Sequence, residues 1–325
     1  MTNVWVVVQT RGQDIHPMAV ETLVAGQKLA ADTGATAGAV VIGENASEVA
    51  AKLEAWDLEA VHVLAHEALA RYTPGAYVGA LSEVIADRTP DYVLFPHTYQ
   101  SVEYVPRLAV AVNGALVPEA TSFRLEGDSV IWRRAVFGGK LQADVRATGA
   151  PVLVSVQSGA FSASDRREGT APVEVLEITG TVTPDREILG VEEVAGEHVD
   201  LSAAERVVAV GRGVGGEDKL EPIRELAKAL GAELGGSRPV IDSGWLPRDC
   251  QIGSSGQTVA PKLYVALGIS GAIQHLVGMK GSQVVVAINK DKSAPIFGVA
   301  DYGIVGDLHE IVPALLQALE EAKAG

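Results

Sequence analysis

The first half of the chain alternates short apolar runs with longer segments that carry apolar residues on one face. The apolar runs predict buried strands at residues 4–8, 37–42, 60–64 and 92–95. The longer segments predict helices at residues 17–32, 47–56, 74–88 and 101–112. Pro17 and Pro74 suit the first turn of a helix, and Ser47 suits a cap. This alternation predicts a mostly parallel sheet with helices on its faces.

The pattern changes after about residue 115, where consecutive strands replace the alternation. Strands are predicted at residues 129–137, 139–146 and 152–156, with a hairpin turn at Gly138 and Gly139. They should add antiparallel members at one edge of the sheet. An acidic connector of weak periodicity, which contains Pro184, spans residues 180–204. We therefore expect an N-terminal α/β domain over residues 1–200 and a C-terminal domain over residues 205–325.

A second alternation of strands and helices follows the connector. It predicts strands at residues 206–210, 262–267 and 283–288, and helices at residues 219–230, 270–279 and 307–321. Strands that alternate with helices form a parallel sheet covered on both faces. The predicted fold class is α/β, with a doubly wound C-terminal domain.

Charge and composition exclude several function classes. The formal net charge is -15, so we expect no nucleic-acid partner, because that binding relies on Lys and Arg. A single cysteine, Cys250, excludes an intrachain disulfide and suits a reducing cytoplasm. The histidines lack metal-ligand spacing, and we expect no metal. The chain runs straight into its first strand and has no membrane-length apolar run, which predicts a cytoplasmic protein without direct membrane insertion.

A glycine-rich loop follows the first strand of the second domain. Gly211, Gly213 and Gly216 match the G-x-G-x-x-G dinucleotide fingerprint, and Glu233 lies where its ribose-binding acid would fall. An NAD-dependent oxidoreductase is therefore one alternative, and a non-catalytic nucleotide-sensing module is another. An ordinary strand–helix turn explains the same glycines equally well.

Two further glycine-rich segments carry hydroxyl groups. Ser254 and Ser255 stand between glycines, which would let the backbone approach a phosphate or a ring nitrogen, although an ordinary polar turn has the same composition. Ser270 follows a strand at the expected start of a helix, where free amides favour an anion, or it is simply an N-cap. His275 lies further along that helix and could be an ordinary surface histidine.

The segment around Ser270 also nearly matches a hydrolase nucleophile elbow. The G-x-S-x-G pattern would need glycine in place of Ala272, with His309 as the base and Asp301 or Asp307 as the acid. A serine hydrolase is therefore a minor alternative.

Polar residues end two later segments of the second domain. Asn289 closes a buried strand, at the end where α/β sheets bind ligands, and could bond a ribose or serve in a turn. Asp307 precedes the last helix, where it could cap the helix or accept a hydrogen bond from a sugar.

Taken together, the order and spacing of these segments are specific. The segments read GWLPRDCQIGSSG, APKLYVALGISGAIQHLVGMKGS, VVVAINKDKSAPIF and VADYGIVGDL. They closely resemble the FAD domain of electron-transfer flavoprotein α (large) subunits, and the first half of the chain fits that family more loosely. The resemblance implies FAD contacts at Arg212, Ser237, Arg238, Ile252, Gly253, Ser254, Ser255, Ser270, Gly271, Ala272, Ile273, Gln274, His275, Asn289, Asp307 and Leu308.

The resemblance also implies roles for some of these residues. Family members usually have GQTG where this chain has GSSG, so Ser255 keeps a hydroxyl that could bond flavin N5. Arg238 and His275 would offset the negative charge that reduction places on the flavin.

The same resemblance implies an electron carrier and no substrate turnover of its own. Its partner would be a β subunit that holds AMP, in a heterodimer where the first domain serves structure and subunit contact. Electrons would come from acyl-CoA and other dehydrogenases, as in fatty acid β-oxidation, and pass to a membrane quinone oxidoreductase.

Overall fold

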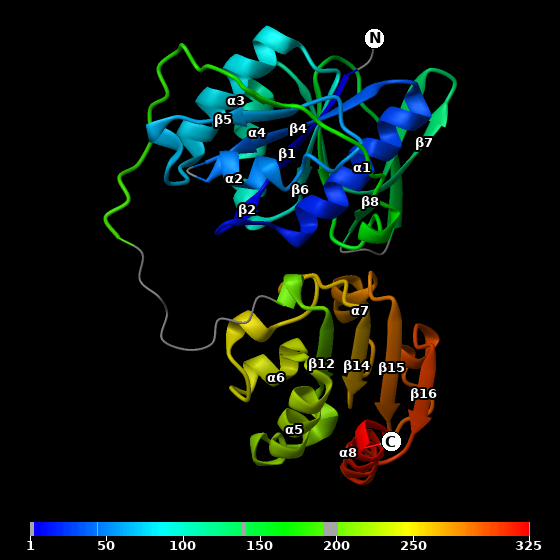
Figure 1. Cartoon of the computed structure of the whole chain (residues 1–325). Coiled ribbons are helices and arrows are strands. Elements are labelled where there is room, and N and C mark those ends of the chain that lie inside the picture. Colours follow the sequence, from blue (N-terminus) through cyan, green and yellow to red (C-terminus); the bar gives the residue numbers. More distant parts are fainter. Residues whose placement is uncertain (1–2, 44, 138–140, 191–200, 325) are drawn as a thin grey trace. The chain divides into compact units, whose positions relative to one another are not determined.

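The computed structural model describes residues 3–43, 45–137, 141–190 and 201–324. The chain forms two compact units, each built around its own sheet (Figure 1). Among the described residues, 3–136 and 142–190 belong to the first unit, and 201–324 belong to the second. The predicted turn at Gly138 and Gly139, and part of the predicted connector at 180–204, lie outside the described residues.

The sheet of the first unit has nine strands within the described chain, in the order β11-β5-β4-β1-β6-β10-β7-β8-β9. The strands are β1 (Asn3–Val8), β4 (Thr36–Ile42), β5 (Val61–Leu64), β6 (Tyr92–Pro96), β7 (Ala115–Glu126), β8 (Ser129–Val136), β9 (Leu141–Arg146), β10 (Val152–Val156) and β11 (Val173–Val175). The pairs from β11 to β7 are parallel, and β8 pairs antiparallel with β7. The predicted mostly parallel sheet with an antiparallel edge is confirmed.

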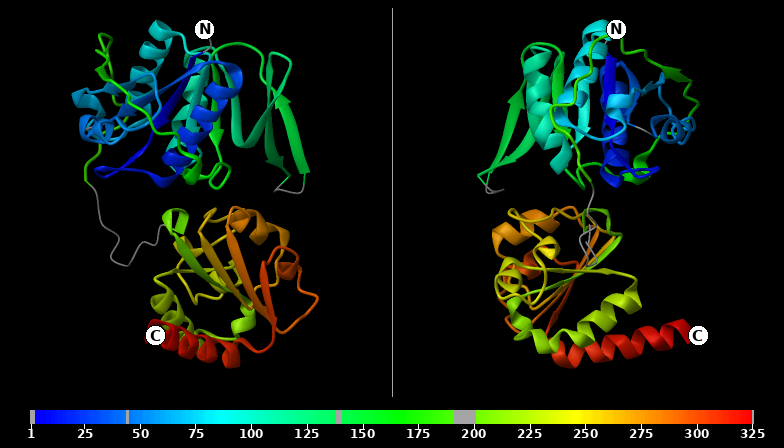
Figure 2. Two further views of the ribbon diagram at one scale, coloured as in Figure 1. Left: turned by 45° about the vertical axis from the view of Figure 1, so that its right-hand side comes forward. Right: turned by 90° about the vertical axis from the view of Figure 1, so that its left-hand side faces the viewer.

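Helices cover both faces of this sheet (Figure 2). They are α1 (Pro17–Thr33), α2 (Ala46–Ala51), α3 (Pro74–Arg88) and α4 (Tyr99–Ala111). Successive residues of a strand face opposite sides, so Val4, Val6 and Val8 of β1 join the core with α1 and α2. Trp5 and Val7 join the core with α3 and α4 on the other side.

The helix boundaries test the predicted start signals. Pro17 and Pro74 do occupy first turns, as predicted. The prediction that Ser47 caps its helix is wrong, because α2 already begins at Ala46. The same helix ends early at Ala51, and Trp56 is buried at an isolated antiparallel bridge to Glu168.

The second unit is a parallel sheet of five strands within the described chain, in the order β13-β12-β14-β15-β16. The strands are β12 (Arg206–Val210), β13 (Glu233–Gly236), β14 (Leu263–Leu267), β15 (Val284–Asn289) and β16 (Tyr302–Val305). The helices are α5 (Glu221–Leu230), α6 (Arg238–Asp242), α7 (Ile273–Met279) and α8 (Leu308–Ala324). Separate apolar cores lie on the two faces, so the doubly wound fold is confirmed.

The strand order of the second unit has a switch point. From β12 the chain moves to one side to form β13, and then crosses to the other side to form β14. Loops that leave the carboxyl ends of neighbouring strands in opposite directions open a crevice, where open α/β sheets bind ligands. The fold therefore points to the carboxyl edge around β12 and β14 as the candidate site.

In neither unit does a described helix have the length and apolar character needed to cross a bilayer.

Candidate functional site

The carboxyl edge of the second sheet gathers almost all of the residues singled out in the sequence. They lie at or after the ends of β12 (Arg212), β13 (Ser237 and Arg238), β14 (Ser270, Gly271, Ala272, Ile273, Gln274 and His275), β15 (Asn289) and β16 (Asp307 and Leu308). Because all five strands are parallel, these loops emerge at the same edge. The loop of Ile252, Gly253, Ser254 and Ser255 joins them through a hydrogen bond from the Ile252 amide to the Gly236 carbonyl at the end of β13, 2.9 Å long.

At the switch point, glycine is required for the close approach of two loops. A Cβ on Gly211 would lie 2.2 Å from the Gly268 carbonyl oxygen. The Gly213 amide donates to that same oxygen at 3.1 Å, and Gly268 itself has φ of 64°. These glycines are therefore explained by backbone packing between the β12 and β14 loops.

The loop after β12 does not lead directly into a helix, as the dinucleotide fingerprint requires. A separate turn, Glu217–Lys219, stands between Gly216 and α5. Glu217, Asp218 and Glu221 place carboxylates where a pyrophosphate would approach α5. Arg212 is exposed on the preceding turn, Arg212–Val214. This geometry argues against the NAD-dependent alternative, because like charges there would repel the phosphates.

The segment from Ser270 to Gln274 presents unused backbone donors. The predicted helix start at Ser270 is wrong, since α7 begins at Ile273 and has 7 residues. Gly271 has φ of 86° and packs so closely that a Cβ would lie 2.2 Å from the Ile296 amide nitrogen. Within the described chain, no hydrogen bond is donated by the backbone amides of Ser270, Gly271, Ala272, Ile273 or Gln274. Ser270, Ala272, Ile273 and Gln274 are also exposed, so these amides can meet an anion or a carbonyl oxygen.

The loop that contains Ser254 and Ser255 is held by hydrogen bonds, one of them to α7. The Ser254 amide donates to the Gln274 carbonyl at 2.8 Å, and the Gly253 amide donates to the Gln257 carbonyl at 3.2 Å. Ser255 Oγ accepts a hydrogen bond from Gln251 Nε2 at 2.9 Å, which leaves its hydroxyl hydrogen to donate. Both serines are exposed. The loop thus offers two oriented hydroxyls beside the unused amides.

His275 lies beneath this surface and not on it. Its side chain is buried, and Nε2 lies 2.8 Å from the Tyr264 hydroxyl. Burial lowers the pKa of His275 to about 4, with the nearby Ile252 carbonyl opposing part of that shift. Nδ1 is buried without a hydrogen-bond partner among the described residues. The expectation of a surface histidine is wrong because the ring is buried, and this burial disfavours the cationic form that the expected charge compensation needs.

Arg238 and Ser237 occupy the start of α6 after β13. Arg238 Nε lies 3.4 Å from Asp242 Oδ2, in a pair so exposed that water screens it. Its guanidinium is therefore available to an anionic ligand. The Ser237 side chain is buried and makes no capping bond to α6.

Asn289 and Asp307 brace the edge of the site. Asn289 Nδ2 donates to the Ile269 carbonyl at 2.9 Å, and its Oδ1 accepts from the Asp291 amide at 3.0 Å. Asp307 accepts from the His309 amide at 2.9 Å, as the predicted cap alternative requires, and pairs with Lys290 at 2.9 Å.

These bonds lower the pKa of Asp307, the His309 amide having the larger effect. Leu308, the first residue of α8, is buried and packs into the apolar core on that face of the sheet.

The hydrolase alternative finds no support in this geometry. The ring of His309 bonds the Val214 carbonyl at 3.0 Å, and Asp307 bonds the His309 backbone and not its ring. A Ser270 base–acid relay is therefore not assembled. Among the described residues, no three His, Cys, Asp or Glu side chains lie together in a group that could hold a metal ion.

Three residues that matter here escaped the sequence analysis. Tyr264 partners His275, Gln251 holds Ser255, and Lys290 pairs with Asp307. Tyr264 looks like any buried strand residue. Gln251 and Lys290 lie within the segments quoted for the resemblance, but nothing in their spacing assigns them a partner. Only the folded arrangement identifies them.

The site suits an extended, partly anionic ligand such as FAD. Unused amides, two exposed hydroxyls and the exposed cations Arg212 and Arg238 surround the switch point. A dinucleotide carries phosphates for the amides and cations, and ring and sugar groups for the hydroxyls. His275 adds a buried ring nitrogen that has no hydrogen-bond partner within the described part of the chain.

Comparisons with known proteins match both units of the chain. A family profile described as "Electron transfer flavoprotein FAD-binding domain" matches residues 200–280, and one described as "Electron transfer flavoprotein domain" matches residues 4–180. The electron transfer flavoprotein subunit alpha of Thermoanaerobacterium thermosaccharolyticum is 35% identical, over 99% of this chain and 98% of the relative. The subunit of the same name from Bacillus subtilis is 36% identical, over 96% of both chains. The acryloyl-CoA reductase electron transfer subunit beta of Anaerotignum propionicum is 33% identical, over 99% of this chain and 96% of the relative.

Proposed function

Because the chain belongs to the family of electron-transfer flavoprotein α subunits, we propose that it binds one FAD in its second unit and carries electrons between proteins. It would turn over no substrate of its own. The observation that carries the proposal is the run of unused amides from Ser270 to Gln274, flanked by the hydroxyls of Ser254 and Ser255.

Different residues of this chain would bind different parts of the cofactor. The amides of the Ser270 segment, together with Arg212 and Arg238, would bind its electron-rich oxygens. Ser255 would donate its hydroxyl hydrogen to a ring nitrogen, since Gln251 already fills its acceptor side. When bound, FAD supplies the reversible redox chemistry.

His275, Asn289 and Asp307 act differently. Neutral His275 would offer a hydrogen bond from its buried ring and no positive charge. Asn289 would hold the β14 and β15 loops at a fixed separation. One carboxylate oxygen of Asp307 pairs with the exposed Lys290. A sugar hydroxyl could donate a hydrogen bond to that same oxygen.

We also propose the partners that family membership suggests. The chain would pair with a β subunit that holds AMP, through its first domain at residues 1–200, leaving residues 205–325 to hold FAD. Acyl-CoA and other dehydrogenases would supply electrons, as in fatty acid β-oxidation in the cytoplasm, and a membrane quinone oxidoreductase would accept them. The name of the Anaerotignum propionicum relative joins electron transfer to an acryloyl-CoA reductase, and this supports acyl-CoA chemistry.

Co-expression with a β subunit tests the proposal. The purified pair should be yellow, with flavin absorption bands that bleach when an acyl-CoA dehydrogenase and its substrate are added. The released cofactor should be FAD, at one per α chain. A correctly folded pair that is colourless and takes up no FAD on reconstitution would refute the proposal.

A further inference from the structure

The first unit contains a cavity that the proposed flavin site does not use. Its volume is about 480 Å³, and it lies beyond the ends of β1 and β4, between them and α3 and α4. Around it the strand order is β5-β4-β1-β6-β10. From β1 the chain adds β4 and β5 on one side and then crosses over to add β6 on the other side. This is a second switch point at the carboxyl edge of a parallel sheet, where such folds bind ligands. Its volume falls in the range of small-molecule sites.

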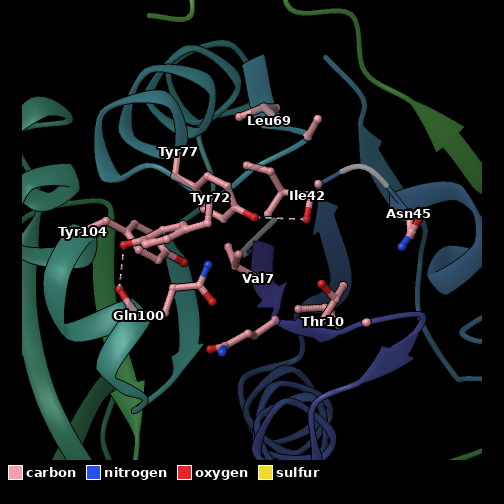
Figure 3. Close-up of a pocket in the computed structure, with 14 residues that line it drawn as sticks. Val7, Thr10, Ile42, Asn45, Leu69, Tyr72, Tyr77, Gln100 and Tyr104 are labelled. Atoms are coloured by element: carbon pink, nitrogen blue, oxygen red, sulfur yellow. Dashed lines mark hydrogen bonds between the residues drawn. The ribbon is translucent and has the colours of Figure 1, made fainter. Parts of the chain in front are cut away.

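One wall of the cavity is aromatic. Figure 3 shows Tyr72, Tyr104 and Gln100 on one side of the hollow, and Ile42, Thr10 and Asn45 on the other. The rings of Tyr77 and Tyr72 meet edge to face with centroids 4.9 Å apart, and those of Tyr77 and Tyr104 with centroids 5.6 Å apart. Aromatic rings arranged in this way give a planar ligand flat surfaces to contact.

Hydrogen bonds hold the tyrosines in place. The Tyr72 hydroxyl donates to Glu103 Oε2 at 3.0 Å, and the Tyr77 hydroxyl lies 3.5 Å from the Ile42 carbonyl. Burial raises the pKa of Tyr77 to about 12, and the neighbouring Gln100 amide lowers it by less. The wall is therefore neutral and fixed in position before any ligand arrives, which reduces the entropic cost of binding.

The polar groups of the cavity are amides and hydroxyls. Gln9 Oε1 accepts a hydrogen bond from Thr98 Oγ1 at 2.6 Å, which orients the donor end of that amide. Gln100 brings a second side-chain amide, and Thr10 brings a hydroxyl. None of the described lining residues is charged, and the Glu103 carboxylate lies just behind Tyr72. A phosphate would find no cation here, so the ligand should be uncharged.

We propose that this cavity binds a neutral purine base or nucleoside. A glutamine amide can pair with the edge of adenine through one donor and one acceptor, and Gln100 offers both. The tyrosine wall would contact the ring face. The first domain would then have a ligand-binding role as well as the structural one expected from the sequence.

Equilibrium dialysis of labelled adenosine against the full chain, saturated with FAD, tests this proposal. Gln100→Leu keeps the side-chain volume but removes the amide, and should weaken adenosine binding about tenfold or more. Ala70→Phe should abolish binding, because Ala70 lines the cavity in an ordinary helical conformation and a ring there fills it. Gln283→Leu, an exposed glutamine of the second unit, is the matched control and should bind as the unaltered chain does.

AMP and uridine distinguish the chemistry that is recognised. AMP should bind no more tightly than adenosine, and uridine should bind more weakly than adenosine. Adenosine binding that survives both cavity substitutions would overturn the proposal, as would no detectable binding by the unaltered chain at millimolar adenosine. Much tighter binding of AMP, or equal binding of uridine, would also overturn it.

Discussion

Buried His275 should make the second unit unstable in acid. Its imidazole lies beside Tyr264 in the apolar core, and burial lowers its pKa from 6.5 to about 4. An unfolded chain exposes the ring and restores the ordinary value. Between these two pH values the unfolded state binds more protons than the folded state, so stability rises with pH.

The size of the effect follows from the pKa shift. One pKa unit corresponds to about 1.4 kcal/mol, so the shift from 6.5 to about 4 gives roughly 3 kcal/mol. This contribution to folding is complete above pH 6.5 and is lost as the pH falls toward 4. A loss of that size is a large part of the stability of an ordinary domain.

The single cysteine supplies the assay. Cys250 is buried in the second unit, so its reaction with an acid-active pyridyl disulfide reports the unfolding of that unit. Urea titrations of flavin-free protein at pH 7.0, about 5.5 and about 4.5 would give the pH dependence. His275→Asn should flatten it, while His309→Asn, which removes an exposed histidine, should not. Parallel pH curves for His275→Asn and the unaltered chain would refute the reasoning.

Three further substitutions test the site. Gly271→Ala should lower the stability of the second unit by roughly 1–2 kcal/mol because of its backbone angle alone. It should also weaken FAD binding, because the new Cβ would lie 2.2 Å from the Ile296 amide nitrogen. Gly298→Ala is the control: it has open space around it and should change neither the melting temperature nor the FAD Kd. Arg238→Ala should raise the FAD Kd without lowering the melting temperature, because its side chain is exposed, and an unchanged Kd would remove it from the site. Asn289→Leu should lower stability by roughly 1–3 kcal/mol in urea titration through two lost hydrogen bonds, and no loss would contradict its bracing role.

The element order was predictable because its periodicity is strong. The strand at 152–156 and the helix at 74–88 have the predicted bounds, and most other elements differ by a few residues. Strand β7 was missed because Pro118 interrupts its pattern and Glu119 takes a φ of 57°, which is unusual for glutamate. Strand β16 was missed because it has only 4 residues and Gly303 interrupts its apolar positions, as in a turn.

The site was predictable as a set of loops but not as a set of interactions. Parallel strands bring their carboxyl ends together, so the residues that follow them had to meet. The lowered pKa of His275 was missed because it depends on burial of the ring by residues of other elements, which the linear pattern does not show. Asn289 was expected to contact a ligand or to serve in a turn, and neither expectation includes the bond from its amide to the Ile269 carbonyl across the loops. Such contacts depend on distances that a linear pattern does not contain.

The central claim is that the carboxyl edge of the second sheet holds the flavin. A crystal structure of the heterodimer with FAD tests it most directly. We predict cofactor oxygens within hydrogen-bonding distance of backbone amides between Ser270 and Gln274, with Ser255 beside the flavin ring. A cofactor seated elsewhere on the chain, with those amides still facing water, would contradict the account.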